Sequence, residues 1–298
     1  MLSITVQEGI MKFTVLIENH ALDSALHAEH GVSFYIEKDG FRMLFDTGES
    51  HLFLENAKTL GIDLSHLDAI AFSHNHYDHC GGFLSYVAAG YAPCPVYAHT
   101  GFFRRKWWDH SLDAPEEETY ENAMELVGPI VTPEFFFQHG YAKFRMISDD
   151  VFELAPDVYL VGNFPMERGE ETPHPSSKMA LDPETFVPDQ FRDEQICVIR
   201  TKQGLVVFTG CAHNGIMNIL TTITQRFPGE SIYAMFGGTH LVQSEAPRIT
   251  NTVAYIRQQN IKTAGVCHCT GPDAIAAFAA TVPAYVEIGA GFTWNDEE

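Results

Sequence analysis

The sequence predicts a layered α/β protein that forms one domain. Apolar, β-rich segments recur along the chain, and amphipathic helical segments stand between several of them. Apolar residues make up 45% of the 298 residues, which suits a globular chain with one large core. The sequence has no long linker, low-complexity tract or clear internal repeat. We therefore expect a single domain over residues 1–298, although the length would allow two.

The first third of the chain predicts strands and one helix. The expected strands are three β-rich segments at Lys12–Glu18, Val32–Glu37 and Phe41–Phe45. Asp39-Gly40 predicts a turn, so that the last two form a hairpin. A helix is expected over His51–Leu60, with Ser50 as its N-cap and Gly61 as its end. The apolar run Leu67–Ser73 then predicts a buried strand.

The segment from about 100 to 190 is less regular and rich in proline, glutamate and aromatic residues. We expect it to form short strands and covering loops within the same domain. Regular patterns return after it. The predicted strands are Gln195–Arg200, Gly204–Thr209, Ser231–Phe236 and a last one around Ala284–Ile288, and the predicted helices lie near Gly215–Arg226 and Ala246–Gln259.

Three histidines and an aspartate fall within six residues directly after the strand that ends at Ser73. The ligand candidates of this segment are His74, His76, Asp78 and His79. Imidazole and carboxylate ligands together suit zinc and other borderline divalent ions. A solvated histidine-rich loop is the alternative, but the apolar strand before the motif favours a metal site.

Further ligands must come from elsewhere, because four residues of one loop cannot surround two metal ions. Three histidines each follow a later apolar segment, namely His213, His240 and His268. Cys267 and Cys269 flank the last of them. Because successive side chains of a strand point to opposite sides, we expect both cysteines to face away from the metal if His268 faces it.

Composition limits the partners of the chain. Its 18 basic and 39 acidic residues give a net charge of −21, which opposes binding to nucleic acids and anionic membranes. The one basic cluster, Arg104–Lys106 before Trp107-Trp108, is interpreted as a solvated loop, with a phosphate-binding or lid role as the alternative. We expect a small-molecule substrate and neither a nucleic-acid nor a membrane partner. The sequence does not indicate the oligomeric state.

Location is also predicted from composition. No apolar run approaches the roughly 20 residues needed to span a bilayer, and residues 1–10 lack the features of a secretion signal. Six cysteines in a chain of this length do not form a disulfide framework. We therefore expect a cytoplasmic protein with reduced thiols.

The spacing His-x-His-x-Asp-His at residues 74–79 resembles that of the metallo-β-lactamase superfamily at every defined position. The resemblance implies an αβ/βα four-layer sandwich, in which two mixed sheets lie face to face with helices outside and metals at one sheet edge. It also implies a dinuclear site, with His74 and His76 on one ion and Asp78 and His79 on the other. The flavin-linked di-iron members usually have Glu in place of His76, so this chain resembles the hydrolase-like branch.

The chain departs from the family pattern at two positions. Cys211 stands where the family has the aspartate that bridges the metals, and Asn163 stands where it has the third histidine of the first ion. Because asparagine is a poor zinc ligand, we expect His213 to replace it and His268 to complete the second ion. We expect Cys211, Asn163 and Asp46 to support the ligands from behind, although Cys211 could itself supply a thiolate and Asp46 could serve as a turn residue.

Several further stretches resemble one branch of the superfamily, the group containing the archaeal 7,8-dihydropterin-6-methyl-4-(β-D-ribofuranosyl)aminobenzene-5′-phosphate synthase. These stretches are Glu18-Asn19, Ala28–Glu37, Asp193–Gln195, Gly210–Ile216, Gly237–Leu241 and His268–Gly271. That synthase joins a dihydropterin to a ribofuranosyl-aminobenzene phosphate. The group carries a glutamate where this chain has Asn163.

Together these features predict a metal-dependent hydrolase-like enzyme that acts on a small phosphorylated or pterin-like molecule. We expect two divalent transition metals, zinc first, with iron or manganese as alternatives. Asp78 and His240 are the expected catalytic residues; His240 would contact substrate or transfer a proton, although a role as a ligand or a structural residue stays open. The alternatives to hydrolysis are the C–N bond-forming synthase and, because the bridging carboxylate is missing, a non-catalytic metal or ligand sensor.

Overall fold

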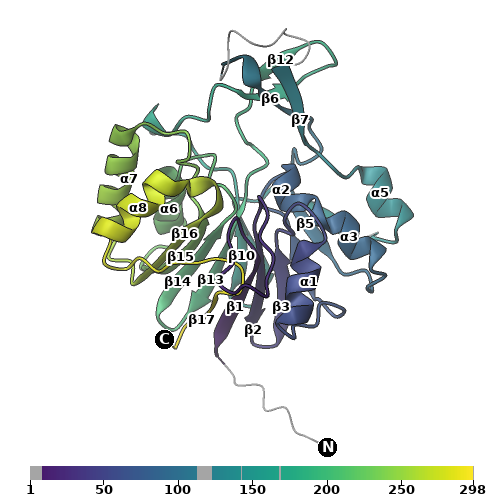
Figure 1. Ribbon diagram of the computed structural model, residues 1–298, viewed down its shortest axis with the longest axis horizontal. Helices are drawn as coiled ribbons and strands as arrows, with labels where there is room; N and C mark the ends of the chain where they lie inside the picture. Colours follow the sequence, from purple (N-terminus) through teal and green to yellow (C-terminus); the bar gives the residue numbers. More distant parts are fainter. Residues whose placement is uncertain (1–8, 113–122, 142, 168, 298) are drawn as a thin grey trace, which may run out of the picture.

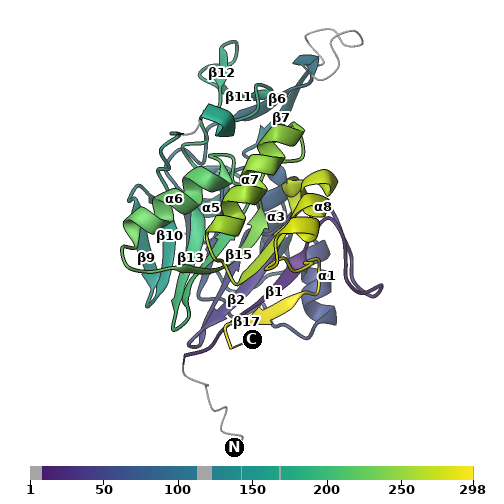
Figure 2. The same ribbon diagram turned by 90° about the vertical axis from the view of Figure 1, so that its left-hand side faces the viewer.

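The computed structural model describes residues 9–112, 123–141, 143–167 and 169–297. The expectation about a secretion signal concerns residues 1–10, of which residues 1–8 lie outside this range. Two mixed β-sheets lie face to face, and helices cover the outer side of each (Figures 1 and 2). This arrangement is the αβ/βα four-layer sandwich implied by the resemblance, and the predicted fold class is confirmed.

The first sheet has seven strands in the order β17-β1-β2-β3-β4-β5-β8. Neighbours from β17 to β3 are antiparallel, and neighbours from β3 to β8 are parallel. The strands are β1 (Met11–Ile17), β2 (Ser33–Lys38), β3 (Phe41–Phe45), β4 (Ala69–Ala71), β5 (Val96–His99), β8 (Phe144–Ile147) and β17 (Thr293–Asn295). Its outer helices are α1 (Leu52–Thr59), α3 (Gly82–Ala88) and α5 (Pro133–Gln138), and the short α2 (Tyr77–Cys80) lies at the sheet edge.

The second sheet has six strands in the order β16-β15-β14-β13-β10-β9. It too is divided, with parallel pairing from β14 to β16 and antiparallel pairing in the rest. The strands are β9 (Val151–Ala155), β10 (Val158–Val161), β13 (Ile196–Thr201), β14 (Gly204–Thr209), β15 (Ile232–Gly238) and β16 (Thr263–Cys267). Its outer helices are α6 (Ile216–Arg226), α7 (Ala246–Gln258) and α8 (Pro272–Thr281).

Aromatic side chains fill the space between the two sheets. Phe13 of β1 meets Phe208 of β14 and Phe236 of β15, with ring centroids 4.9 Å and 4.5 Å away. All three rings are fully buried, and burial of such a side chain stabilises the fold by about 1.5–3 kcal/mol. The central strands are therefore buried on both faces, which explains their nearly continuous apolar sequences.

A third, four-stranded sheet stands over one end of the sandwich, and we call it the capping sheet (Figure 1, top). Its strands are β6 (Lys106–Asp109), β7 (Met124–Gly128), β11 (Ser177–Ala180) and β12 (Phe186–Pro188), in the order β12-β11-β6-β7. The segment from about 100 to 190 thus supplies short strands to both sheets of the sandwich and forms the capping sheet. Lys106 is buried in β6, so the interpretation of Arg104–Lys106 as a solvated loop is wrong for its last residue.

Two details of the predicted elements need correction. The helix α1 begins at Leu52, one residue after the predicted start, while the Ser50 hydroxyl still accepts a hydrogen bond from the Leu52 amide. No strand forms over Ala284–Ile288, where pairing with the sheet is limited to one bridge between Tyr285 and Ala264. Ile288 nevertheless packs into the core between the sheets, so the apolar pattern there reflected burial rather than pairing.

No described helix is both long enough and apolar enough to cross a bilayer. All six cysteines are free thiols, and all are buried.

Candidate metal centre

The predicted ligands meet at the edge of the sandwich beneath the capping sheet. β3 and β4 are parallel neighbours in one sheet, and β14, β15 and β16 are parallel neighbours in the other. The carboxyl ends of parallel strands lie at the same edge, where α/β proteins commonly bind ligands. The segments that follow these strands therefore bring their polar residues together.

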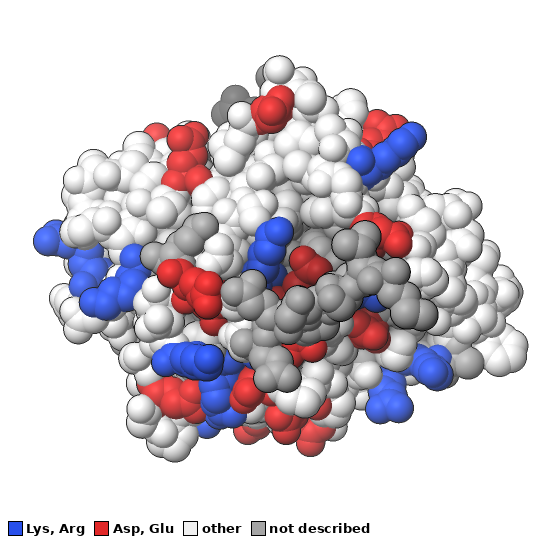
Figure 3. All heavy atoms as spheres, turned by 90° about the horizontal axis from the view of Figure 1, so that it is seen from below, with Lys and Arg blue, Asp and Glu red and all other residues white. Residues whose placement is uncertain are grey.

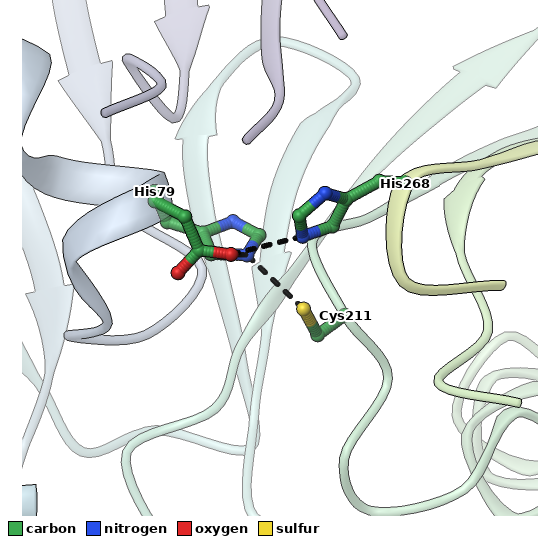
Figure 4. A group of neighbouring side chains, drawn as sticks. His79, Cys211 and His268 are labelled. Carbon is green, nitrogen blue, oxygen red and sulfur yellow. Dashed lines mark hydrogen bonds and ion pairs between the residues drawn. The ribbon is translucent and has the colours of Figure 1, made fainter. Parts of the chain in front are cut away.

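One group of donor atoms combines the histidine motif with two residues of the second sheet. The Asp78 carboxylate lies 3.0 Å from His268 Nε2 and 3.4 Å from His79 Nε2, and His79 Nε2 lies 3.1 Å from Cys211 Sγ. Figure 4 shows His79, Cys211 and His268 pointing toward one another. Bonds of about 2.0–2.3 Å in a tetrahedron place donor atoms about 3.3–3.8 Å apart. The four side chains therefore have nearly the spacing of a metal-binding set.

A second group lies beside the first. His74 Nε2 faces His213 Nε2 at 3.2 Å, and one ring nitrogen of each histidine lies within 4.8 Å of Cys211 Sγ. The His76 ring lies 4.5 Å from the His74 ring and 5.0 Å from the His213 ring. His213 Nδ1 has no hydrogen-bond partner among the described residues. The buried rings of His74 and His213, with the partly exposed ring of His76 beside them, could hold a second metal ion.

Burial sets the protonation of these histidines. It lowers the pKa of His74, His76 and His213 well below the ordinary value, and the positive charge of Lys106 lowers it further. They are therefore neutral at physiological pH, which is the form that binds metal. For His79, burial lowers the pKa, but Asp78 and Asp46 outweigh burial and raise it well above the ordinary value.

Asp46 holds His79 from behind. Its carboxylate accepts hydrogen bonds from His79 Nδ1 at 2.8 Å and from the Ser73 hydroxyl and amide, both at 2.7 Å. Asp46 is fully buried and has a φ of 61°, a left-handed conformation. The contact leaves His79 Nε2 free to face Cys211, as expected for a carboxylate that orients a ligating imidazole. The structure thus places Asp46 where the sequence analysis expected a supporting residue.

Three further polar residues support ligands without having been predicted to do so. Glu18 accepts from the His268 amide at 2.6 Å, and Asn19 accepts from His268 Nδ1 at 2.9 Å. The Glu194 carboxylate accepts from the His213 amide at 2.7 Å. These residues stand in stretches noted only for their resemblance to one branch, and no spacing in the sequence connects them to the histidines.

Asn163 lies away from the ligands. Its side-chain amide donates to the Ser148 carbonyl at 3.0 Å and to the Asp150 carboxylate at 2.9 Å, and the residue lines a neighbouring cavity with His99. The expectation that Asn163 supports the metal ligands is therefore corrected. His213 occupies the position beside His74 instead.

Cys269 also needs correction, because it does not face away from the site. The strand β16 ends at Cys267, and His268–Thr270 form a 3₁₀ turn in which His268 has a φ of 53°. Strand alternation therefore stops before Cys269, whose sulfur lies within 4.8 Å of the donor atoms of Cys211 and His240. Cys267 lies in the core between the sheets, as expected.

His240 faces the same space from the end of β15. It has a φ of 49°, its ring lies 4.1 Å from the His213 ring, and neither ring nitrogen has a hydrogen-bond partner among the described residues. Two free ring nitrogens next to the donor groups suit either metal binding or contact with a bound molecule.

A cavity of about 370 Å³ opens onto the donor groups. His240, Asp78 and Cys211 lie on its walls, together with Tyr77 and, from the capping sheet, Trp108. Its volume is in the range of about 300–1,000 Å³ that small-molecule sites occupy. The capping sheet therefore forms one side of a pocket of small-molecule size that is lined in part by aromatic rings.

A buried ion cluster lies against the loop that carries the histidine motif. Lys106 Nζ lies 2.5 Å from the Asp193 carboxylate and 3.2 Å from that of Asp189, and all three side chains are buried. Asp193 also accepts from the Asn75 amide at 3.3 Å, inside the histidine motif. Phe191, beneath Lys106, stacks on the His213 ring at 3.8 Å. The cluster thus contacts both segments that supply the second donor group, the histidine motif and the segment around His213.

Comparison with known proteins gives consistent matches. The family described as the metallo-beta-lactamase superfamily matches residues 28–180, just over half of the chain. The 7,8-dihydropterin-6-methyl-4-(beta-D-ribofuranosyl)-aminobenzene-5'-phosphate synthase of Methanocaldococcus jannaschii is 27% identical over 272 residues, which cover 88% of each protein.

Solved structures agree with this match. Tm1679, described as a metal-dependent hydrolase of the beta-lactamase superfamily, superposes with a TM-score of 0.80 and 29% identity, covering 95% of this chain and 98% of its own. Zn(2+)-bound PqqB from Methylobacterium extorquens superposes with a TM-score of 0.58 and 14% identity, covering 95% and 99%, which shows a shared fold.

Proposed function

The chain belongs to the metallo-β-lactamase superfamily, and we propose that it is a metal-dependent hydrolase-like enzyme with a dinuclear centre. Its substrate would be a small phosphorylated or pterin-like molecule. The observation that carries the proposal is the meeting of two donor groups at Cys211, directly beneath a cavity of small-molecule size.

The donor set fits two divalent ions. We assign His74, His76 and His213 to one ion, and Asp78, His79 and His268 to the other. Imidazole and carboxylate donors suit zinc, with iron or manganese as alternatives. Ions of this kind, when bound, supply Lewis acidity and make a water molecule acidic enough to act as a nucleophile near neutral pH.

The residues around the cavity have distinct tasks in this proposal. His240 exchanges a proton with the bound substrate through one of its free ring nitrogens. The Asp78 carboxylate is a ligand that also lines the cavity, so it can orient a hydrogen-bond donor of the substrate. Its pKa is well below the ordinary value, because His79 and His268 outweigh the effect of burial. Trp108 covers the site and limits the access of water.

Charge supports a small molecule rather than a nucleic acid. The net charge is −21, and on the face opposite the cap Lys and Arg side chains are scattered among Asp and Glu (Figure 3). A nucleic-acid surface would need a concentrated basic stripe to hold phosphates.

A second candidate function is synthesis rather than hydrolysis. It is favoured by the match to the dihydropterin ribofuranosyl-aminobenzene phosphate synthase along 88% of this chain. In that case the chain would form a C–N bond between a dihydropterin and a ribofuranosyl-aminobenzene phosphate. The same centre would then hold the leaving diphosphate instead of activating water.

An assay with the metal-loaded protein separates these functions. We would supply phosphomonoesters, phosphodiesters and lactones singly, and then a dihydropterin diphosphate and the aminobenzene riboside phosphate, both singly and together. The hydrolase proposal predicts product from one substrate in water, and the synthase predicts product only when both partners are present. Full metal content without any turnover would contradict both and favour the sensor.

His240→Ala is expected to lower turnover on any working substrate by about 10²–10⁴-fold, the range typical of a lost general acid or base. Metal content should stay nearly intact, because the six assigned ligands are unchanged. Kinetics and elemental analysis on the same preparation test this, with the exposed His139→Ala as the control. Loss of one metal equivalent would make His240 a ligand, and unchanged kinetics would make it structural.

A further inference from the structure

Cys211 lies between the two donor groups of the candidate metal centre. Three groups of three or more potential ligand side chains occur among the described residues, and Cys211 Sγ belongs to every one of them. It lies 3.1 Å from His79 Nε2 on one side and within 4.8 Å of the His74 and His213 nitrogens on the other. We propose that the Cys211 thiolate is a ligand shared by both metal ions. This inference rests on the dinuclear centre proposed above.

The backbone around Cys211 fixes the position of its sulfur. A Cβ atom on Gly210 would come 2.1 Å from the Ser73 hydroxyl, and one on Gly238 would come 2.4 Å from the Gly210 carbonyl oxygen. Glycine at position 210 therefore allows the end of β14 to lie close to Ser73, and glycine at position 238 allows the end of β15 to lie close to Gly210. Ala212 then turns the chain with a φ of 62°, so that Cys211 and His213 both face the centre.

An anionic ligand at this point would offset part of the positive charge of the two ions. The first ion is otherwise surrounded by three neutral imidazoles, and a second dication lies beside it. Asp46 cannot compensate, because both of its carboxylate oxygens are engaged by Ser73 and His79. Binding releases the thiol proton, and the resulting thiolate is a soft ligand that suits zinc. One negative sulfur between the ions reduces their mutual repulsion in the way a carboxylate would.

Cys269 differs from Cys211 although both line the same cavity. Its thiol donates to the Cys211 carbonyl at 3.4 Å, and its donor group contains only Cys211 and His240. It therefore does not reach the histidines of either proposed ion. Cys269 is the matched control inside the cavity, and Cys267, in the core, is the control outside it.

Cobalt(II) provides the test, because thiolate bound to cobalt gives a charge-transfer band in the near ultraviolet that imidazole and carboxylate do not give. We would titrate the metal-free chain with cobalt and measure bound metal by elemental analysis. A shared thiolate predicts a band that appears with the first ion and changes again with the second. Cys211→Ser should abolish the band, whereas Cys269→Ser and Cys267→Ser should keep it. Cys211→Asp should bind both ions without the band.

Each other outcome overturns the proposal in a recognisable way. Two bound cobalt ions without a band would leave the dinuclear centre intact and make Cys211 a supporting residue only. A band that saturates with the first ion and ignores the second would restrict Cys211 to one ion, and a band lost only in Cys269→Ser would assign the thiolate to Cys269. If the chain binds no cobalt, the proposed function fails together with the shared thiolate. If Cys211→Ser does not fold, the titration of the unsubstituted chain still shows whether a thiolate is bound and whether the second ion changes the band, and Cys269→Ser shows whether Cys269 supplies it.

Discussion

His213→Ala is expected to lose about one of the two metal equivalents. The substitution leaves the first ion with too few protein ligands for a tetrahedral site. His213 Nε2 faces His74 Nε2 at 3.2 Å, and burial keeps both rings neutral and ready to bind. His76→Ala should have a similar effect. Elemental analysis of the variants, prepared in the same metal-supplemented medium, measures the loss.

Asn163→Ala is the matched control for this prediction. Asn163 stands at the family position of a metal ligand, yet its amide is engaged by Ser148 and Asp150. Its removal should leave metal content unchanged. Full metal content in His213→Ala combined with loss in Asn163→Ala would reverse the assignment of the first ion.

Lys106→Met is expected to lower the free energy of unfolding by about 3–5 kcal/mol, the cost of leaving buried charges without their partner. Burial alone would lower the pKa of Lys106, but Asp193 and Asp189 outweigh burial and raise it, so the side chain is charged. The variant leaves two buried carboxylates facing each other. Urea unfolding of the metal-free chain measures the change.

The same capping sheet offers a control in Lys178→Met. Lys178 Nζ lies 3.9 Å from the Asp109 carboxylate, and the lysine side chain is partly exposed. Its loss should cost less than about 1 kcal/mol, as for most exposed pairs. If Lys106→Met cost no more than this control, the buried cluster would not stabilise the fold. Adding Asp193→Asn to Lys106→Met should recover part of the loss, because it removes one unpaired charge.

Much of the fold and several candidate ligands could be predicted, because the residue patterns that indicate them lie within short stretches of the sequence. The motif at residues 74–79 holds its candidate ligands within six consecutive residues, so the spacing alone predicts a metal site. His213 and His268 could be proposed because each follows an apolar segment that forms a strand, and parallel strands end at one edge. The strands around Phe13 and Phe208 could be recognised because burial on both faces makes them continuously apolar.

The remaining features depend on which segments become neighbours in space. Cys269 faces the cavity because β16 stops at Cys267, and no residue pattern marks that end. Lys106 is buried because Asp189 and Asp193, more than 80 residues away in sequence, surround it. Glu18, directly after β1, accepts a hydrogen bond from the amide of His268, which lies 250 residues later in the sequence. Such contacts follow from the pairing of distant strands and are not visible in local sequence patterns.

Elemental analysis of the purified chain tests the central claim most directly. The two donor groups predict one to two equivalents of zinc, iron or manganese per chain after growth in metal-supplemented medium, rising to about two on reconstitution. Loss of both ions in a chain with His74, His76, Asp78 and His79 all replaced by alanine would assign the metal to this centre. Less than about a quarter of an equivalent of any transition metal in the unsubstituted chain would contradict the proposed dinuclear site.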